Sequence, residues 1–208
     1  MTDISIGRAA RRGLAGLFDA RGRDDRAQFW FFLHLIFGPL TIVQMVIQTV
    51  MAWPSFGASP AGDAGAVPAN FAMVEGQFRA MATAAYVAAG LYLLGSLLLL
   101  TATARRLHDR GRAGWWAVML PLATFATGQG QARRMTEIAE QAPRAFAEFE
   151  KNPSPDFSGL WDLQVKMQAG TSGPDWTAIL GGLVILWLVV ELARAGAAGP
   201  NRFGPPPE

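Results

Sequence analysis

Four long stretches without a charged residue restrict this chain to a membrane-spanning helical fold. They cover residues 27–62, 80–104, 113–132 and 176–190. A charge at the bilayer centre costs about 2.5–3.5 kcal/mol, and a spanning helix needs about 20 mostly apolar residues. We therefore predict an all-α integral membrane protein, a bundle of four transmembrane helices at residues 29–51, 82–104, 114–128 and 176–193.

The composition disfavours one alternative fold and excludes several chemistries. A soluble bundle is disfavoured because buried core segments usually run only about 10–14 residues. The first 28 residues carry six arginines and four aspartates, so the first apolar run is predicted to be an uncleaved signal anchor. The chain has no cysteine, which excludes disulfides and thiolate metal sites. Its net charge of +2 is too small to indicate nucleic acid binding.

The placement of basic residues predicts the orientation. Twelve arginines lie before the first span, between spans two and three, or after span four, whereas six basic residues are spread over two longer loops. Short segments rich in Lys and Arg stay in the cytoplasm. We therefore expect cytoplasmic segments at residues 1–28 and 194–208 and a cytoplasmic arginine-rich turn at 105–113, within a unit of three spans at 29–128.

The remaining segments are predicted to lie outside the spans. The first outer loop, at about 52–80, is rich in Gly, Ala and Pro and is expected to be irregular. The second, the periplasmic loop 129–175, should be partly helical over 132–150, with an interruption near Pro143. Arg8 to Phe18 has the pattern of a basic amphipathic helix resting on anionic lipid, although two glycines weaken that prediction.

The most distinctive segment is the arginine-rich turn between spans two and three. Its basic residues leave it strongly positive, which favours binding of a lipid phosphate, and two tryptophans follow at the level of the aromatic belt. The alternative is a topology signal, with the histidine and aspartate bonded to backbone or to an arginine. Metal binding and catalysis are not indicated, because no second ligand group or oriented nucleophile is evident. The candidate residues are Arg105, Arg106, His108, Asp109, Arg112, Trp115 and Trp116.

This turn also carries a family resemblance. The run from Arg105 to Asp109, with Gly111 and the Gly-Trp-Trp that ends at Trp116, resembles the signature of the bacterial inner-membrane family known as domain of unknown function 805 (DUF 805). Two shorter motifs support it: Gly22 to Trp30 before the first span, and Asn201 to Gly204 after the last. The resemblance implies a small multi-span helical protein of the bacterial inner membrane, and it implies no established activity.

All three motifs are predicted to face the cytoplasm, so a compact bundle could bring them into one basic surface with an aromatic rim. Such a surface would bind anionic phospholipid or another membrane protein. The alternative is that each motif only anchors its own helix end. The candidate residues outside the turn are Arg23, Arg26, Trp30, Asn201 and Arg202.

The first span also carries a polar face. At about 100° per residue, its polar side chains fall in one narrow sector. The favoured interpretation is hydrogen bonding that stabilises helix packing, and the alternative is a polar path for a proton or small solute. The residues are His34, Thr41, Gln44 and Gln48, while Glu191 in span four is expected to pair with Arg194 or the arginine-rich turn.

Small residues and a proline give the packing predictions. Two small pairs at four-residue spacing should allow close helix approach, and Pro121 should kink the third span. The pairs are Ala85 with Ala89 and Ala178 with Gly182.

Together these patterns predict a structural or accessory membrane protein without enzyme activity or a cofactor, able to form homo-oligomers. The alternative is a small transporter or exporter component that uses the polar face of the first span.

Overall fold

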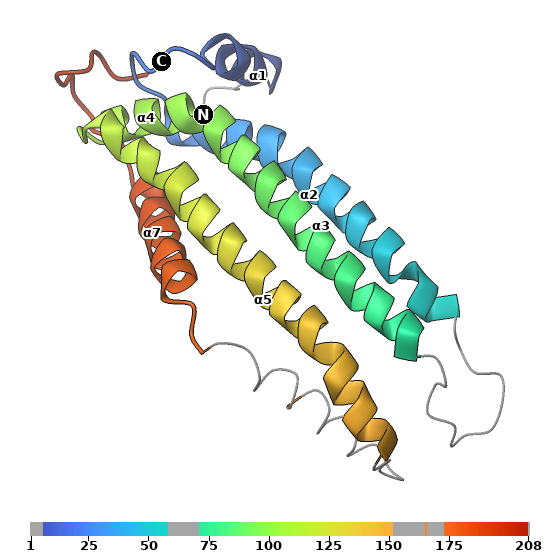
Figure 1. Cartoon of the computed structure of the whole chain (residues 1–208). Helices are drawn as coiled ribbons and strands as arrows, with labels where there is room; N and C mark the ends of the chain where they lie inside the picture. Colours follow the sequence, from blue (N-terminus) through green and yellow to red (C-terminus); the bar gives the residue numbers. More distant parts are fainter. Residues whose placement is uncertain (1–5, 58–70, 152–164, 166–172, 208) are drawn as a thin grey trace.

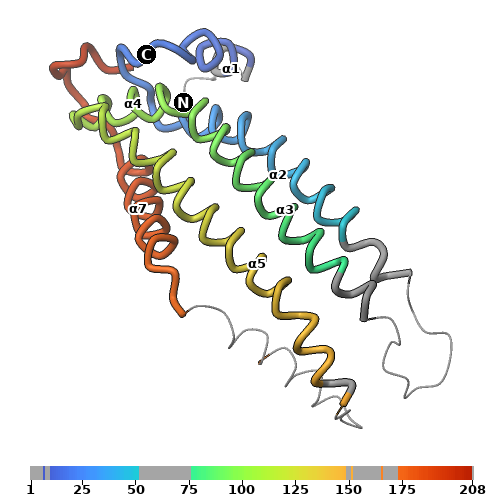
Figure 2. Tube along the Cα trace, viewed as in Figure 1, coloured from blue at the N-terminus to red at the C-terminus, as the bar shows by residue number. Residues whose placement is uncertain are grey.

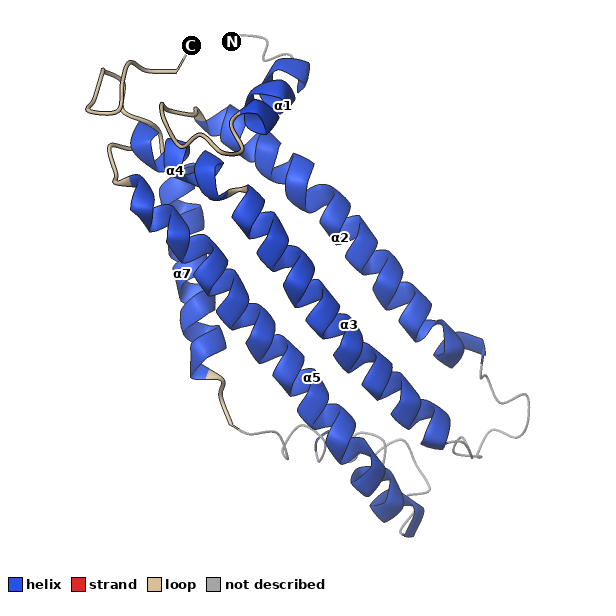
Figure 3. Ribbon diagram, turned by 45° about the horizontal axis from the view of Figure 1, so that its top comes forward, coloured by secondary structure: helices blue, strands red, loops and turns tan. Residues whose placement is uncertain are grey.

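The structure is a computed structural model that describes residues 6–57, 71–151, 165 and 173–207. The described chain is helical, and Figure 3 draws it as helices and loops without a strand. Its elements are α1 (Ile6–Ala15), α2 (Arg26–Gly57), α3 (Phe71–Leu98), α4 (Leu100–Asp109), the short 3-10 helix η1 (Gly114–Val118), α5 (Met119–Lys151) and α7 (Trp176–Ala193).

Four long helices form an open row in the order α2, α3, α5, α7 (Figure 1). Within the described residues α3 packs on α5, α5 on α7 and α2 on α3, while α2 and α7 make few direct contacts with each other. The helices α1 and α4, η1 and the C-terminal tail gather at one end of the row (Figure 2). We call this the motif end and define it as residues 6–26, 100–118 and 191–207; the opposite end is the loop end.

Three described helices are long and apolar enough to cross a membrane: Arg26–Met51, Gly76–Leu98 and Trp176–Ala193. They correspond to the first, second and fourth predicted spans. The predicted span 114–128 is not among them, because it is divided between η1 and the first third of α5. The apolar part of α5 is short, since the polar residues Gln129 and Gln131 and the charged Arg133 follow soon after its first turns.

The structure corrects the prediction for the second outer loop. The helix expected at 132–150 is the continuation of α5, which runs without a break from Met119 to Lys151 and through Pro143. Pro121 lies in the first turn of α5, where its missing N–H has no helical acceptor, so the predicted kink does not follow. Most of the first outer loop (58–70) and the end of the second (152–164 and 166–172) lie outside the described residues.

Local hydrogen bonds explain where the helices around the motif end begin and end. Asp25 caps α2: its Oδ1 accepts from the amide of Gln28 at 2.7 Å, and Gln28 Oε1 accepts from the Asp25 amide at 3.3 Å. After α4, the amide of Gly111 donates to His108 O and that of Arg112 to Leu107 O. This pair of bonds needs a left-handed residue, and Gly111 supplies it at φ +70.

Small residues allow α5 to approach its two neighbours. A Cβ placed on Gly128 would lie 2.9 Å from the Cβ of Ala89 in α3. A Cβ on Gly181 of α7 would lie 2.9 Å from the Ala123 carbonyl, whereas Gly182 faces open space. Of the predicted pair, Ala178 does lie at the contact with α5, where a Cβ on Gly130 would be 2.5 Å from its own Cβ, while Gly181 takes the place expected for Gly182.

Candidate functional site

Asp109, at the end of α4, lies at the centre of a buried ion-pair network. Its Oδ1 accepts from Nε and Nη2 of Arg23 at 3.0 and 2.8 Å, and its Oδ2 accepts from Nη1 of Arg106. All three side chains are buried, and Arg106 is 0% exposed. Removing one partner from a buried ion pair leaves an uncompensated charge. The segment before α2 and the end of α4 therefore depend on each other.

The same two arginines also hold the C-terminal tail through its backbone. Four carbonyls of the tail and one in the last turn of α7 accept hydrogen bonds from their guanidinium groups, whose several N–H donors point in different directions. The acceptors are Ala197, Gly199 and Gly204 for Arg23, and Leu192 and Arg194 for Arg106.

The tail also contacts Asp109 directly. The amide of Ala197 donates to the Asp109 carbonyl at 2.9 Å. A Cβ on Gly196 would overlap the Asp109 carboxylate, so only glycine lets the backbone pass this close.

A second buried pair connects α4 with the N-terminal segment. Arg105 Nε donates to Asp24 Oδ2 at 2.8 Å, and Arg105 Nη1 donates to the carbonyls of Gly16, at 2.6 Å, and Asp19. A Cβ on Gly16 would lie 2.7 Å from that Nη1, and a Cβ on Gly13 would overlap the Phe32 ring. The two glycines that weaken the predicted α1 helix are therefore the residues that let it pack.

The motif near the C-terminus forms a tight turn against α4. The amides and carbonyls of Asn201 and Gly204 bond reciprocally, and Asn201 Oδ1 accepts from the amide of Phe203 at 2.9 Å. Asn201 Nδ2 then donates to the carbonyl of His108 at 3.0 Å, and Gly204 has a φ of +125. The turn places the Phe203 ring on the imidazole of His108, with centroids 3.8 Å apart and planes at 11°.

His108 is held between two motifs. Its Nδ1 donates to the Gly22 carbonyl at 3.3 Å. Partial burial lowers the pKa of the imidazole below its ordinary value, and the bond to Gly22 opposes this shift. The neutral form is therefore the one that stacks on Phe203 at neutral pH.

Glu191, at the end of α7, pairs with both of its expected partners. Its carboxylate lies 3.1 Å from Arg112 Nε, 3.6 Å from Arg110 Nη2 and 3.4 Å from Arg194 Nη1. Nearby, Trp115 stacks on Trp116 at 4.1 Å, and Trp116 lies 5.5 Å from Trp187. These rings form an aromatic rim beside the arginines.

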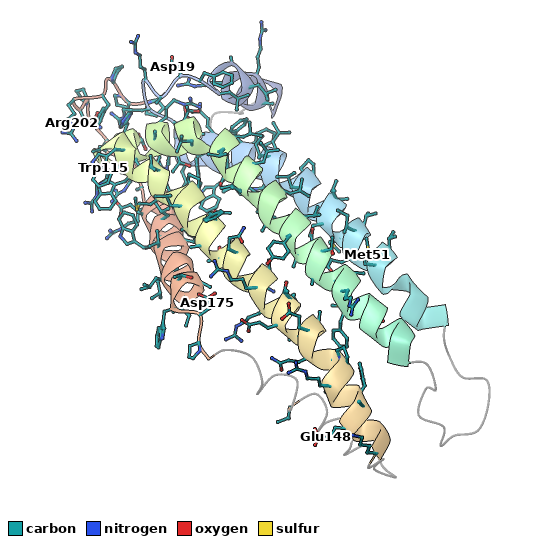
Figure 4. All side chains as sticks on the ribbon, viewed as in Figure 1. Asp19, Met51, Trp115, Glu148, Asp175 and Arg202 are labelled. Carbon is teal, nitrogen blue, oxygen red and sulfur yellow. The ribbon has the colours of Figure 1, made fainter. Side chains whose placement is uncertain are left out.

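The structure thus brings the three motifs together but divides their residues into two groups. The buried group forms ion pairs and hydrogen bonds within the chain and is not exposed to an external phosphate: Arg23, Arg105, Arg106 and Asp109. The group with exposed side chains lies on the outer surface of the motif end: Arg26, Arg112, Trp115 and Arg202. Trp30, His108, Trp116 and Asn201 are partly buried. Figure 4 shows Trp115 and Arg202 at this end, far from Glu148.

The polar face of α2 does not act as one unit. His34 and Thr41 are exposed, and His34 Nδ1 donates to the carbonyl of Trp30 in its own helix. Gln44 and Gln48 instead line a cavity of about 710 Å³ with residues of α3, α5 and α7. Gln44 Oε1 is buried without a hydrogen-bond partner, so the predicted stabilising bond across helices is not formed by that atom.

Sequence reasoning missed several residues of the network. Asp24 and Gly196 lie outside any periodic hydrophobic pattern. Their partners, Arg105 and Asp109, are more than 80 positions away in the chain. Trp187 could have been found, because a tryptophan near the end of a span belongs to the aromatic belt. Within the described residues, no group of three or more His, Cys, Asp or Glu could hold a metal ion.

Comparison with known proteins gives one match. A family described as "Protein of unknown function (DUF805)" matches residues 17–205, nearly the whole chain and all three motifs. No curated protein and no solved structure matches it.

Proposed function

Because this chain belongs to the DUF805 family, whose description assigns no activity, we propose from its geometry that it is an accessory protein of the bacterial inner membrane. In this proposal its motif end lies at the cytoplasmic surface and binds anionic phospholipid, which positions it beside another membrane protein. The observation that carries the proposal is the convergence of the three motifs into one ion-paired unit with arginines and tryptophans on its surface.

The proposed topology has four spans with both termini in the cytoplasm. The segment before α2 and the C-terminal tail are bonded to each other through Arg23 and Gly199. Two chain ends on the same side require an even number of crossings. With α2, α3 and α7 as three of them, α5 supplies the fourth, and its short uncharged part is shielded between α3 and α7.

Charge distinguishes the two ends of the helix row. The motif end contains twelve arginines and five carboxylates, whereas residues 71–80, 131–151 and 173–175 at the loop end contain five basic and six acidic residues. Each basic residue near an anionic leaflet contributes about 1 kcal/mol to its attraction. Exposed Trp115 belongs at the headgroup level, where indole rings concentrate.

Reporter fusions test the topology. A reporter active only in the cytoplasm should work at the C-terminus and be silent when inserted near residue 150. Activity at both positions would mean that α5 does not cross, and the four-span proposal would be abandoned.

Lipid retention tests the binding surface. The double variant Arg26→Gln with Arg202→Gln removes exposed charge without touching the buried pairs. Native mass spectrometry of the purified protein should show about thirtyfold weaker retention of phosphatidylglycerol, from about 1 kcal/mol for each of the two charges. The matched control is Arg133→Gln with Arg144→Gln at the loop end, which should keep the lipid. Equal retention by both variants would contradict the proposal.

The cavity beside Gln44 and Gln48 supports a second candidate, a small transporter component. No Asp, Glu, Lys, Arg or His is among the described residues that line it, so a neutral solute suits it better than an ion or proton. Solute uptake into proteoliposomes that depends on Gln48 would favour this function over the accessory one.

A further inference from the structure

The cavity in the helix row lies apart from the arginine network, at membrane depth. All four long helices line it, and α2 and α7 make few direct contacts with each other. Val189 lines it from α7 and is 42% exposed. A ligand could therefore enter sideways from the bilayer. Its volume of about 710 Å³ lies in the range of about 300–1,000 Å³ that holds a drug-sized ligand.

The lining combines an apolar wall with uncharged polar groups. Gln44 and Gln48 from α2 and Gln131 from α5 supply amides, and Tyr92 supplies a phenol. The hydroxyl of Thr124 already donates to the Leu120 carbonyl, so it offers only an acceptor. With no charged side chain among the described lining residues, the site is complementary to a ligand that is itself uncharged.

One lining residue indicates what the ligand must offer. Gln44 lines the cavity, and its Oε1 is buried without a hydrogen-bond partner, so the amide has to turn before that oxygen meets a ligand. An unpaired buried polar atom costs about 1–3 kcal/mol, which a ligand donor would recover. A hydroxyl satisfies this amide in either orientation, because it both donates and accepts.

We infer that this cavity binds a neutral lipid with one acyl chain and a hydroxyl-bearing head, of the monoacylglycerol type, with a hydroxyl bonded to Gln44. The chain lies along the apolar wall, and the volume suits one chain rather than the two of a phospholipid. This site is independent of the anionic lipid proposed at the motif end.

Two lipids with the same chain test the inference. Monoolein carries hydroxyls and methyl oleate does not, so titration of the purified full chain, followed by native mass spectrometry, should show about a two- to tenfold preference for monoolein, the worth of one hydrogen bond. Gln44→Leu should reduce that preference to about one without changing phosphatidylglycerol retention. Equal binding of both lipids by the native chain would mean non-specific annular lipid only and would overturn the inference.

Filling the cavity gives the second arm. Ala88 lines the cavity, whereas Val43 is an exposed residue of α2 outside it. Ala88→Phe should abolish binding of both lipids, and Val43→Phe should leave it unchanged. Equal binding by these two variants would place the lipid elsewhere. If Ala88→Phe fails to fold, the test rests on Gln44→Leu titrated with the same two lipids. A preference for monoolein that survives this substitution would contradict the assignment of the hydroxyl to Gln44.

Discussion

At the motif end, buried charged side chains join segments that are far apart in the chain, whereas at the loop end α3 and α5 pack through small and aromatic residues. Asp109 and Asp24 bind three buried arginines at the first end. At the second, Ala82, Ala139 and Ala142 are buried, and the Phe78 and Phe146 rings lie 6.3 Å apart.

This difference has a physical cause. Apolar contacts are non-directional and stabilise any close helix pair, while a buried ion pair is tolerated only with correct partners and geometry. The buried ion pairs of the motif end therefore hold the segment before α2, the end of α4 and the tail in one arrangement, whereas the apolar contacts at the loop end keep α3 and α5 side by side. Substitutions should separate these contributions.

The largest effect is expected at the centre of the network. Asp109→Asn keeps the shape of the side chain but leaves Arg23 and Arg106 without a counter-charge, so we expect a loss of about 3–5 kcal/mol of stability. Thermal unfolding in detergent measures the loss, and limited proteolysis should show early release of the tail. Glu140→Gln on the exposed surface of α5 is the control and should stay within about 0.5 kcal/mol. Equal stability of both variants would remove the distinction between the two ends.

A smaller effect is expected where α3 and α5 pack. Ala132 is 0% exposed, and Ala132→Leu should cost about 1–3 kcal/mol through overpacking. Thermal unfolding measures this cost, while the protease sensitivity of the tail should not change. Ala147→Leu, on an exposed position of the same helix, is the control. Release of the tail in the Ala132 variant would show that the two ends are coupled.

The cap of α2 should contribute less again. Asp25→Ala removes the acceptor for the Gln28 amide and should cost about 1 kcal/mol. Asp25→Asn caps nearly as well and should behave like the native chain in the same unfolding experiment. An equally large loss of stability in Asp25→Asn would show that the charge of Asp25, and not its hydrogen bond to the Gln28 amide, stabilises the start of α2.

The smallest effect concerns pH. The lowered pKa of His108 means that the unfolded chain binds a proton more readily than the folded one, so stability falls as pH drops below the unfolded value of about 6.5. Protection of the tail amides in 195–204 against hydrogen exchange, corrected for the intrinsic base-catalysed rate at each pH, should therefore be weaker at pH 5.5 than at pH 7.5. In His108→Gln the corrected protection should be the same at both pH values. Stronger corrected protection at pH 5.5 in the native chain would reverse the sign and refute the assignment.

Several features of the motif end could be predicted from sequence. The family resemblance is confirmed by the match over residues 17–205. The proposed meeting of the three motifs is present, and Glu191 pairs with Arg194 and with the arginine-rich turn. These predictions succeeded because the charge-poor runs determine where the long helices lie in the chain. When consecutive helices run in opposite directions, every second connecting segment lies at the same end. Lipid binding, orientation and the accessory role remain predictions.

Other features could not be predicted, for identifiable reasons. A helical wheel placed four polar residues of α2 on one face, but only Gln44 and Gln48 reach the cavity, while His34 and Thr41 are exposed. Helix propensity counted Gly13 against α1, although its lack of a side chain is what admits the Phe32 ring. The full length of α5 was not predicted, because hydropathy does not identify its polar second half as part of the same helix. That half is stabilised by packing on α3.

The sequence by itself determined the helical, membrane-type character of this chain and the clustering of its arginines, because hydropathy and charge are local properties. Only the tertiary structure decided which arginines are exposed and which are buried. Arg23 and Asp109 are 86 positions apart, and the burial of both depends on how four helices and a tail pack together. Two arginines three positions apart therefore differ in role: Arg23 binds Asp109, and Arg26 is exposed.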